Sequence, residues 1–155
     1  MTDERSVSGL RRSPFYVLSE DEINYLKSEI IAIGADLSIF RFNHGRRTGY
    51  VDKKDIINIK GDVFSDKNSI HPRDLMSERA VLAHEYHGHR AKRGTTLSEG
   101  SWNDEFRASY LAAKNTPNLS DKDRAYLIMD AVERSKEAGV KIRYNDFMKE
   151  CLYGY

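Results

Sequence analysis

Three of the five histidines fall within six residues of the chain. They lie in the segment His84-Glu85-Tyr86-His87-Gly88-His89, directly after the apolar run Ala80-Val81-Leu82-Ala83. Imidazole nitrogens and carboxylate oxygens are ligands that zinc accepts in proteins. Histidine is only a moderate helix former, so helix propensity does not account for three of them at the end of an apolar segment. The segment therefore predicts a metal site held by His and a carboxylate.

The spacing leaves two candidates for the second histidine ligand. In the familiar zinc-protease signature the two histidines are four residues apart and share one face of a helix. Here position 88 is Gly, and His89 follows His84 by five residues, or about 140° around an ideal helix. A one-residue π-bulge, eased by Gly88, would bring His84 and His89 together. His87 needs no bulge, so motif logic favours His89 and helix geometry favours His87.

A second acidic segment could complete the site. Residues 101–110 predict the start of a helix with acids in its first turn, where the helix dipole favours them. Ala108 and two further alanines would let this helix pack closely on the His-bearing segment. Glu105 is then a candidate third ligand. Asn103 and Asp104 are candidates for orienting a ligand histidine from behind.

The two segments together resemble one peptidase family. His84-Glu85-Tyr86-His87-Gly88-His89 matches the HExxGH motif of dipeptidyl peptidase III, a zinc peptidase family of gluzincin type. Asp104-Glu105-Phe106-Arg107-Ala108 resembles the Glu-Glu-Cys-Arg-Ala-Glu motif of that family. By position, the resemblance implies Zn²⁺ as the cofactor and Glu85 as the catalytic base. It implies three zinc ligands, namely His84, His89 and Glu105.

This chain departs from that family in several respects. It is far shorter, its two motifs lie closer together, and Ser109 stands where the second motif has its last Glu. The compact spacing is more like that of small zincins. The resemblance therefore implies the site, but neither the fold of that family nor its release of dipeptides.

A site of this kind predicts a hydrolase that cuts a peptide or protein substrate with a metal-activated water. The alternative is a toxin-like effector or binding module on a zincin-like scaffold with one narrow protein target. A His-metal nuclease is less favoured, because a net charge of +1 does not attract phosphate, and nucleic acid is not expected as a partner. The oxyanion-stabilising residue stays open among several candidates, namely Tyr110, His71, Arg107, Tyr153 and Tyr155.

Capping signals and apolar spacing place the surrounding elements. Ser19 and Glu22 form a capping-box pattern that starts a helix over residues 20–33, and Ser120 with Asp123 forms a second one before a helix that ends at Gly139. Further helices are predicted over 78–87, 103–114 and 145–152. Strand-like segments are predicted over 36–42, 55–60 and 140–144, and the strand around Ile56–Ile59 is expected to form an edge for an extended peptide. This order predicts an α+β fold, a small zincin-like domain whose helical half carries the metal site.

Composition sets the outer limits. The chain has 155 residues with 25 Lys+Arg, 24 Asp+Glu and 39% hydrophobic residues, which suits a flexible leader over 1–13 and a single globular domain over 14–155. The longest apolar run, residues 30–33, is too short to cross a membrane, so no membrane partner is expected. Cys151 is the single cysteine, so a disulfide framework is excluded and a cytoplasmic location is expected.

Overall fold

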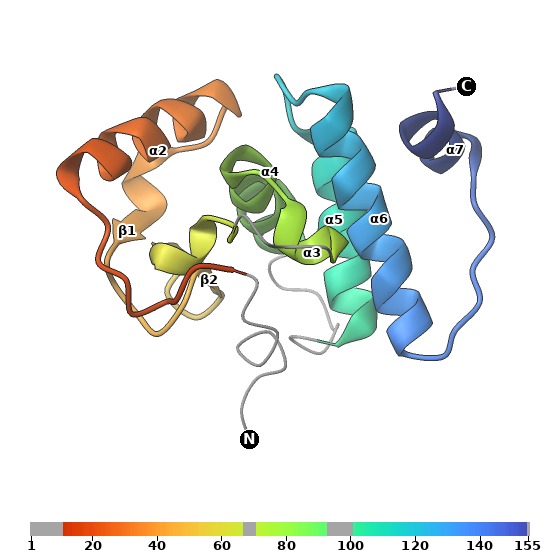
Figure 1. Ribbon diagram of the computed structural model, residues 1–155, viewed down its shortest axis with the longest axis horizontal. Coiled ribbons are helices and arrows are strands. Elements are labelled where there is room, and N and C mark those ends of the chain that lie inside the picture. The colour runs from red at the N-terminus through yellow and green to blue at the C-terminus, as the bar shows by residue number, and fades with distance from the viewer. Residues whose placement is uncertain (1–10, 67–70, 93–100, 155) are drawn as a thin grey trace.

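The structure is a computed structural model that describes residues 11–66, 71–92 and 101–154 (Figure 1). A small sheet and helix α2 form one half of the molecule, and helices α5, α6 and α7 form the other. The predicted α+β class is confirmed. None of the helices in these ranges is both long enough and apolar enough to span a membrane.

Helix α2 (Glu20–Ala32) begins as its sequence predicts. The Ser19 hydroxyl accepts the backbone N–H of Glu22, and the Glu22 carboxylate accepts the backbone N–H of Ser19 at 2.9 Å. These reciprocal bonds satisfy two donors that the start of a helix leaves without partners. Gly34, with φ of +70°, follows the helix in the left-handed conformation that glycine adopts without strain.

The sheet has three strands in the order β1-β3-β2. Strand β1 (Phe40–Phe42) runs parallel to β3 (Ile56–Ile59), and β2 (Gly49–Val51) runs antiparallel to β3. The prediction that residues 56–59 form an edge of the sheet is therefore wrong, because β3 is paired on both sides. The outer strands of this sheet are β1 and β2, and β2 is a strand that the sequence did not predict.

The strand predicted over residues 36–42 begins too early. Leu37–Ile39 is a 3₁₀ turn (η1), because the Asp36 carboxylate accepts the backbone N–H of Ser38 and turns the chain before β1 begins. Beyond β3, a second 3₁₀ turn (η2) covers Gly61–Val63.

After the sheet the chain forms two short helices and then three longer ones. The short helices are α3 (Pro72–Leu75) and α4 (Glu78–Ala83), followed directly by η3 (His84–His89) and η4 (Arg90–Lys92). The longer helices are α5 (Trp102–Asn115), α6 (Asp121–Glu137) and α7 (Asp146–Tyr153). Each of α4, α5, α6 and α7 has a Ser or Asn N-cap whose side chain accepts a backbone N–H of the first turn, which explains why the predicted starts lie close to the observed ones.

Helix α4 lies between the two halves and contributes to the core of each (Figure 1). Leu82 packs with the residues of α2 and the sheet, which include Leu26, Ile30 and Ile57. Ala80 and Ala83 pack with the core of α5, α6 and α7. Because these side chains are fully buried, the chain that leaves α4 enters η3 from a fixed position.

The segment Val140–Tyr144 is not a strand, and that prediction is wrong. It runs without regular secondary structure between α6 and α7, and Ile142 and Tyr144 pack against the core of the helical half. The alternation of apolar and basic residues therefore arises because every second side chain, Ile142 and Tyr144, faces the helices. Among the described residues the segment pairs with no strand.

The predicted leader also ends earlier than expected. Residues 1–10 lie outside the described residues, but Arg11 is buried and its guanidinium donates to the carbonyl oxygens of Asp62 at 2.9 Å and Met76 at 3.1 Å. The backbone N–H of Arg12 donates to the carbonyl oxygen of Phe64 at 3.0 Å. Arg11 and Arg12 are thus part of the folded domain.

Candidate metal centre

The segment His84–His89 is a π-helix that continues α4 without a break. Hydrogen bonds in a π-helix join residues five apart, which places their side chains on one face. The rings of His84 and His89 accordingly lie edge to face, with their centroids 4.7 Å apart. His87 lies elsewhere, with Nε2 2.7 Å from the carbonyl oxygen of Ile33. The structure therefore pairs His84 with His89 and directs His87 towards the end of α2.

Gly88 lets the π-helix approach α5 closely. A Cβ atom added at position 88 would lie 2.8 Å from the Cα of Ala108 and would overlap the carbonyl group of that residue. The backbone of Gly88 does not have a positive φ, so the expectation that its conformational freedom eases the bulge is wrong. The expected close packing of α5 on the His-bearing segment is confirmed at Ala108.

Glu105, in the first turns of α5, contacts both histidines of the pair. Its Oε1 lies 3.1 Å from Nε2 of His84 and 3.3 Å from Nε2 of His89, and its Oε2 lies 3.2 Å from the latter atom. Zinc bonds of about 2.0–2.1 Å in a tetrahedron place neighbouring ligand atoms about 3.3 Å apart. The separations between Glu105 and each histidine are therefore compatible with a shared metal ion, and the same separations serve hydrogen bonds when no ion is bound. Ligand atoms lie within 4.8 Å of one another in two overlapping groups, namely His84, Glu85 and His89, and His89, Asp104 and Glu105.

Glu85 faces the same centre from the π-helix. Ligand atoms of His84, Glu85 and His89 lie within 4.8 Å of one another. Oε1 of Glu85 also accepts the backbone N–H of Tyr50, on strand β2, at 3.0 Å. A strand that the sequence did not predict therefore holds the carboxylate that the sequence singled out as the base.

Asp104 contacts the other ring nitrogen of His89. Its Oδ2 lies 3.5 Å from Nδ1 of His89, and its Oδ1 accepts Nζ of the buried Lys92 at 2.5 Å. The predicted orienting role thus has a contact at Asp104, whereas Asn103 is exposed.

The neighbouring charges shift the protonation of the cluster in the metal-free state. Burial favours neutral His89, but the hydrogen bonds to Asp104 and Glu105 outweigh it and raise the pKa of His89 to about 10. Burial likewise favours protonated Glu105, but its bonds to His84 and His89 hold the pKa of that carboxyl far below its usual range. Glu105 is therefore ionised, and its negative charge can compensate that of a cation.

A second layer of charged residues lies behind His84 and Glu105, and the sequence did not predict it. The Oγ of Ser109 lies 2.8 Å from Nδ1 of His84 and donates to Oδ2 of Asp130 at 2.6 Å. Arg134 lies with Nε 3.3 Å from Oδ1 of Asp130 and with a terminal nitrogen 3.5 Å from Oε1 of Glu105. Helix α6 thus supplies a buried acid and a cation to the centre.

Tyr110 and His71, two candidates for stabilising the oxyanion, make their contacts outside the metal centre. The hydroxyl of Tyr110 accepts Nδ2 of Asn145 at 2.9 Å, and its ring packs on Phe147 of α7. His71 caps α3, with Nδ1 accepting the backbone N–H of Arg73. Among the described residues neither makes a hydrogen bond or ion pair with the histidines of η3, so no contact supports their predicted catalytic role. Of the further candidates, Arg107 and Tyr153 are exposed, and Tyr155 lies outside the described residues.

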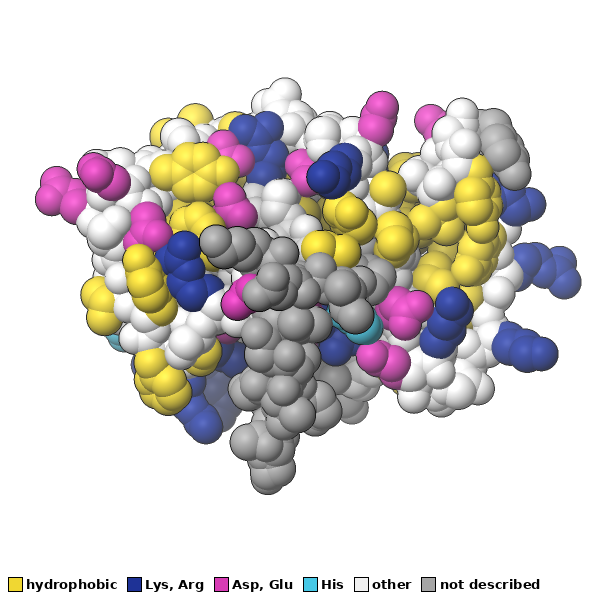
Figure 2. Space-filling model, viewed as in Figure 1, with side chains coloured by type: hydrophobic (Ala, Val, Ile, Leu, Met, Phe, Trp, Pro, Cys, Tyr) yellow, Lys and Arg dark blue, Asp and Glu magenta, His cyan; other side chains and the backbone are white. Residues whose placement is uncertain are grey.

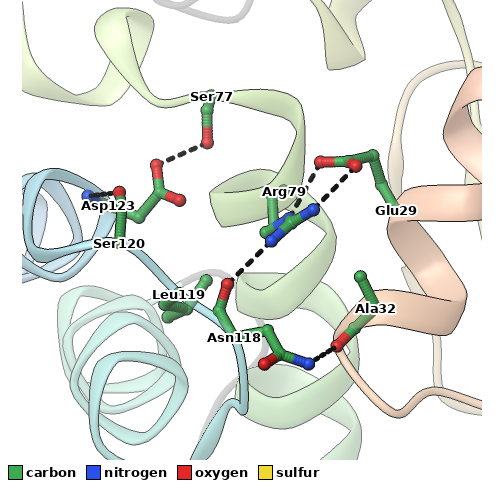
Figure 3. A pocket seen from close by; sticks show the side chains of 8 residues that line it. All are labelled: Glu29, Ala32, Ser77, Arg79, Asn118, Leu119, Ser120 and Asp123. Atoms are coloured by element: carbon green, nitrogen blue, oxygen red, sulfur yellow. Dashed lines mark hydrogen bonds and ion pairs between the residues drawn. The ribbon is translucent and has the colours of Figure 1, made fainter.

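A pocket of about 540 Å³ lies apart from this centre, between α2, α4 and the start of α6 (Figure 3). The guanidinium of Arg79 binds both carboxylate oxygens of Glu29 at 2.9 Å. Ser77 donates to Asp123 at 2.7 Å, and Nδ2 of Asn118 donates to the carbonyl oxygen of Ala32 at 2.6 Å. These bonds join α2 to α4 and to the loop before α6, and none of the residues that line the pocket belongs to the metal centre.

The visible face of the molecule carries acidic and basic side chains mixed together (Figure 2). This distribution agrees with the net charge of +1.

No protein-family model, curated protein or solved structure matches the chain. The function is therefore argued from the residues of the centre.

Proposed function

We propose that the protein is a zinc-dependent peptidase of gluzincin type, a hydrolase that cuts peptide bonds in a peptide or protein substrate. One observation carries the proposal. The π-helix directs Nε2 of both His84 and His89 at the carboxylate of Glu105, with Glu85 beside them. Two imidazoles and one carboxylate are a ligand set of catalytic zinc sites, which keep a further position open.

In this proposal His84, His89 and Glu105 hold the ion. When bound, zinc supplies Lewis acidity, which lowers the pKa of water and polarises the scissile carbonyl. Glu85 would accept the proton of the attacking water and pass it to the leaving amine. Its Oε1 is engaged by the backbone N–H of Tyr50, which leaves Oε2 for that proton. Strand β2, an outer strand of the sheet, thus lies beside the proposed centre and holds its base.

We further propose that the protein acts in the cytoplasm. The proposal rests on the single cysteine, Cys151, which has no second thiol in the chain with which to form a disulfide.

A digest of a mixed peptide library tests the proposed activity. The zinc-loaded protein is expected to cleave peptides, to stop when a chelator removes the metal, and to resume when zinc is restored. Mass spectrometry of the products would report both the cleavage and its sequence preference. An intact library despite bound zinc would contradict a general peptidase and favour a module with one narrow target. Plasmid nicking that requires Glu85 would instead favour a nuclease.

A further inference from the structure

A buried chain of hydrogen bonds leads from α6 to the proposed ligand His84. Asp130 has no exposed surface, and its Oδ2 accepts the hydroxyl of Ser109 at 2.6 Å. The other oxygen, Oδ1, faces Nε of Arg134 at 3.3 Å and Nε of Arg73 at 3.5 Å. The Oγ of Ser109, also fully buried, lies 2.8 Å from Nδ1 of His84.

The direction of these bonds follows from the chemistry of the groups. Burial alone would raise the pKa of Asp130, but the charges of Arg134, His84 and Arg73 and the bond from Ser109 lower it, so the carboxyl is ionised. An ionised carboxylate can only accept hydrogen bonds, so the hydroxyl of Ser109 gives its one proton to Asp130. The Ser109 oxygen can then only accept from His84. Nδ1 of His84 must therefore carry a proton.

We propose that Asp130 is a positioning residue that fixes the tautomer of His84 through Ser109. Without a metal ion, Nε2 of His84 lies 3.1 Å from the ionised Glu105 and donates to it. A metal ion would replace that proton and leave a neutral histidine with its proton on Nδ1 and its lone pair on Nε2. That is the tautomer that can bind a metal ion at the proposed centre. The inference rests on the proposed metal site and adds the residues that prepare one of its ligands.

Asp130→Asn would reverse the direction of these hydrogen bonds while keeping the shape of the side chain at position 130. Arg134 donates to Oδ1 and the guanidinium of Arg73 lies beside that oxygen, so the amide oxygen of the asparagine would occupy this position and the amide NH₂ would face Ser109. Ser109 would then donate to Nδ1 of His84, which moves the ring proton to Nε2 and blocks that ligand. Mutation of a group that orients a ligand histidine commonly lowers metal affinity by about 10–100-fold. We expect a loss of zinc affinity in that range.

A double variant separates this role from a structural one. Ser109→Ala removes the donor that forces the wrong tautomer, so Ser109→Ala/Asp130→Asn is expected to bind zinc more tightly than Asp130→Asn alone. If Asp130 only stabilised the fold, adding the second substitution would weaken binding further or leave it unchanged.

Zinc affinity would be measured by competition with a chelator of known affinity, alongside thermal unfolding of the metal-free variants. Ser135→Ala is the matched control, because Ser135 is equally buried but donates to the carbonyl oxygen of Val132. If Asp130→Asn does not fold, the comparison of Ser109→Ala with Ser135→Ala remains, and only the former is expected to lose affinity, by about tenfold. Equal zinc affinity in wild type and a folded Asp130→Asn, no rescue in the double variant, or equal affinity in the two serine variants would overturn the inference. A wild-type protein that binds no zinc would overturn the proposed function itself.

Discussion

Glu85→Gln is expected to lower peptide hydrolysis by about 10²–10⁴-fold, the range of a lost general base, while zinc content stays unchanged. Glutamine preserves the shape of the side chain, and its amide oxygen can still accept the backbone N–H of Tyr50. The amide cannot take up the proton of the attacking water. The initial rate of cleavage of a library-derived peptide, with zinc measured on the same samples, would test this expectation.

Glu78→Gln is the matched control for that experiment. Glu78 lies one residue into α4, where its carboxylate accepts the hydroxyl of Tyr25 at 3.0 Å. The same loss of charge at this position is expected to leave hydrolysis unchanged. Wild-type rates in Glu85→Gln would remove Glu85 from the role of base.

Gly88→Ala is expected to damage both the fold and the centre. The added methyl group would overlap the backbone carbonyl of Ala108, and backbone atoms cannot turn aside as a flexible side chain can. Overpacking of this kind typically costs about 1–3 kcal/mol of unfolding free energy. Because α5 also carries Glu105, its displacement would move a proposed ligand away from His84 and His89, so zinc affinity is expected to fall as well.

Gly49→Ala provides the comparison. A Cβ atom at position 49 meets no atom within 4 Å, and its backbone does not have a positive φ. Urea unfolding of the metal-free proteins is expected to show a lower midpoint for Gly88→Ala and little change for Gly49→Ala. Equal midpoints for both variants would show that η3 and α5 are not in close contact at this point.

The sequence predicted those features that depend on neighbouring residues. The capping box at Ser19 and the cap at Ser120 mark the starts of α2 and α6, because a short polar side chain at that position satisfies a backbone donor within three residues. The five-residue spacing of His84 and His89 showed that a π-bulge was needed if both faced one ion, and η3 has that form. Whether the pair binds an ion stays a prediction.

Features that depend on partners distant in the chain were missed. Val140–Tyr144 has the composition of a strand, but whether such a segment pairs with a sheet or packs on helices is decided by the elements around it. Strand β2 is only three residues long and has no alternating pattern to mark it, yet it supplies the N–H that holds Glu85.

The position of Asp130 in the sequence could have indicated a buried polar contact. It lies on the face of α6 formed by Leu127, Ile128 and Ala131, where an acid is not expected unless it has a buried partner. That partner could not be named from the sequence, because Ser109 lies on another helix. It also stands where the Glu-Glu-Cys-Arg-Ala-Glu motif, which residues 104–108 resemble, has its last Glu. The sequence therefore predicted the proposed ligands but not the groups that orient them.

The zinc content of purified protein tests the central claim most directly. We expect about one zinc per chain, as for a site with two histidines and one glutamate, and its loss in three variants, namely His84→Ala, His89→Ala and Glu105→Ala. His87→Ala is the control, because its ring faces Ile33, and it is expected to keep the metal. Zinc lost with His87 and kept without His89, or no zinc bound by wild type under any loading condition, would contradict the proposed centre.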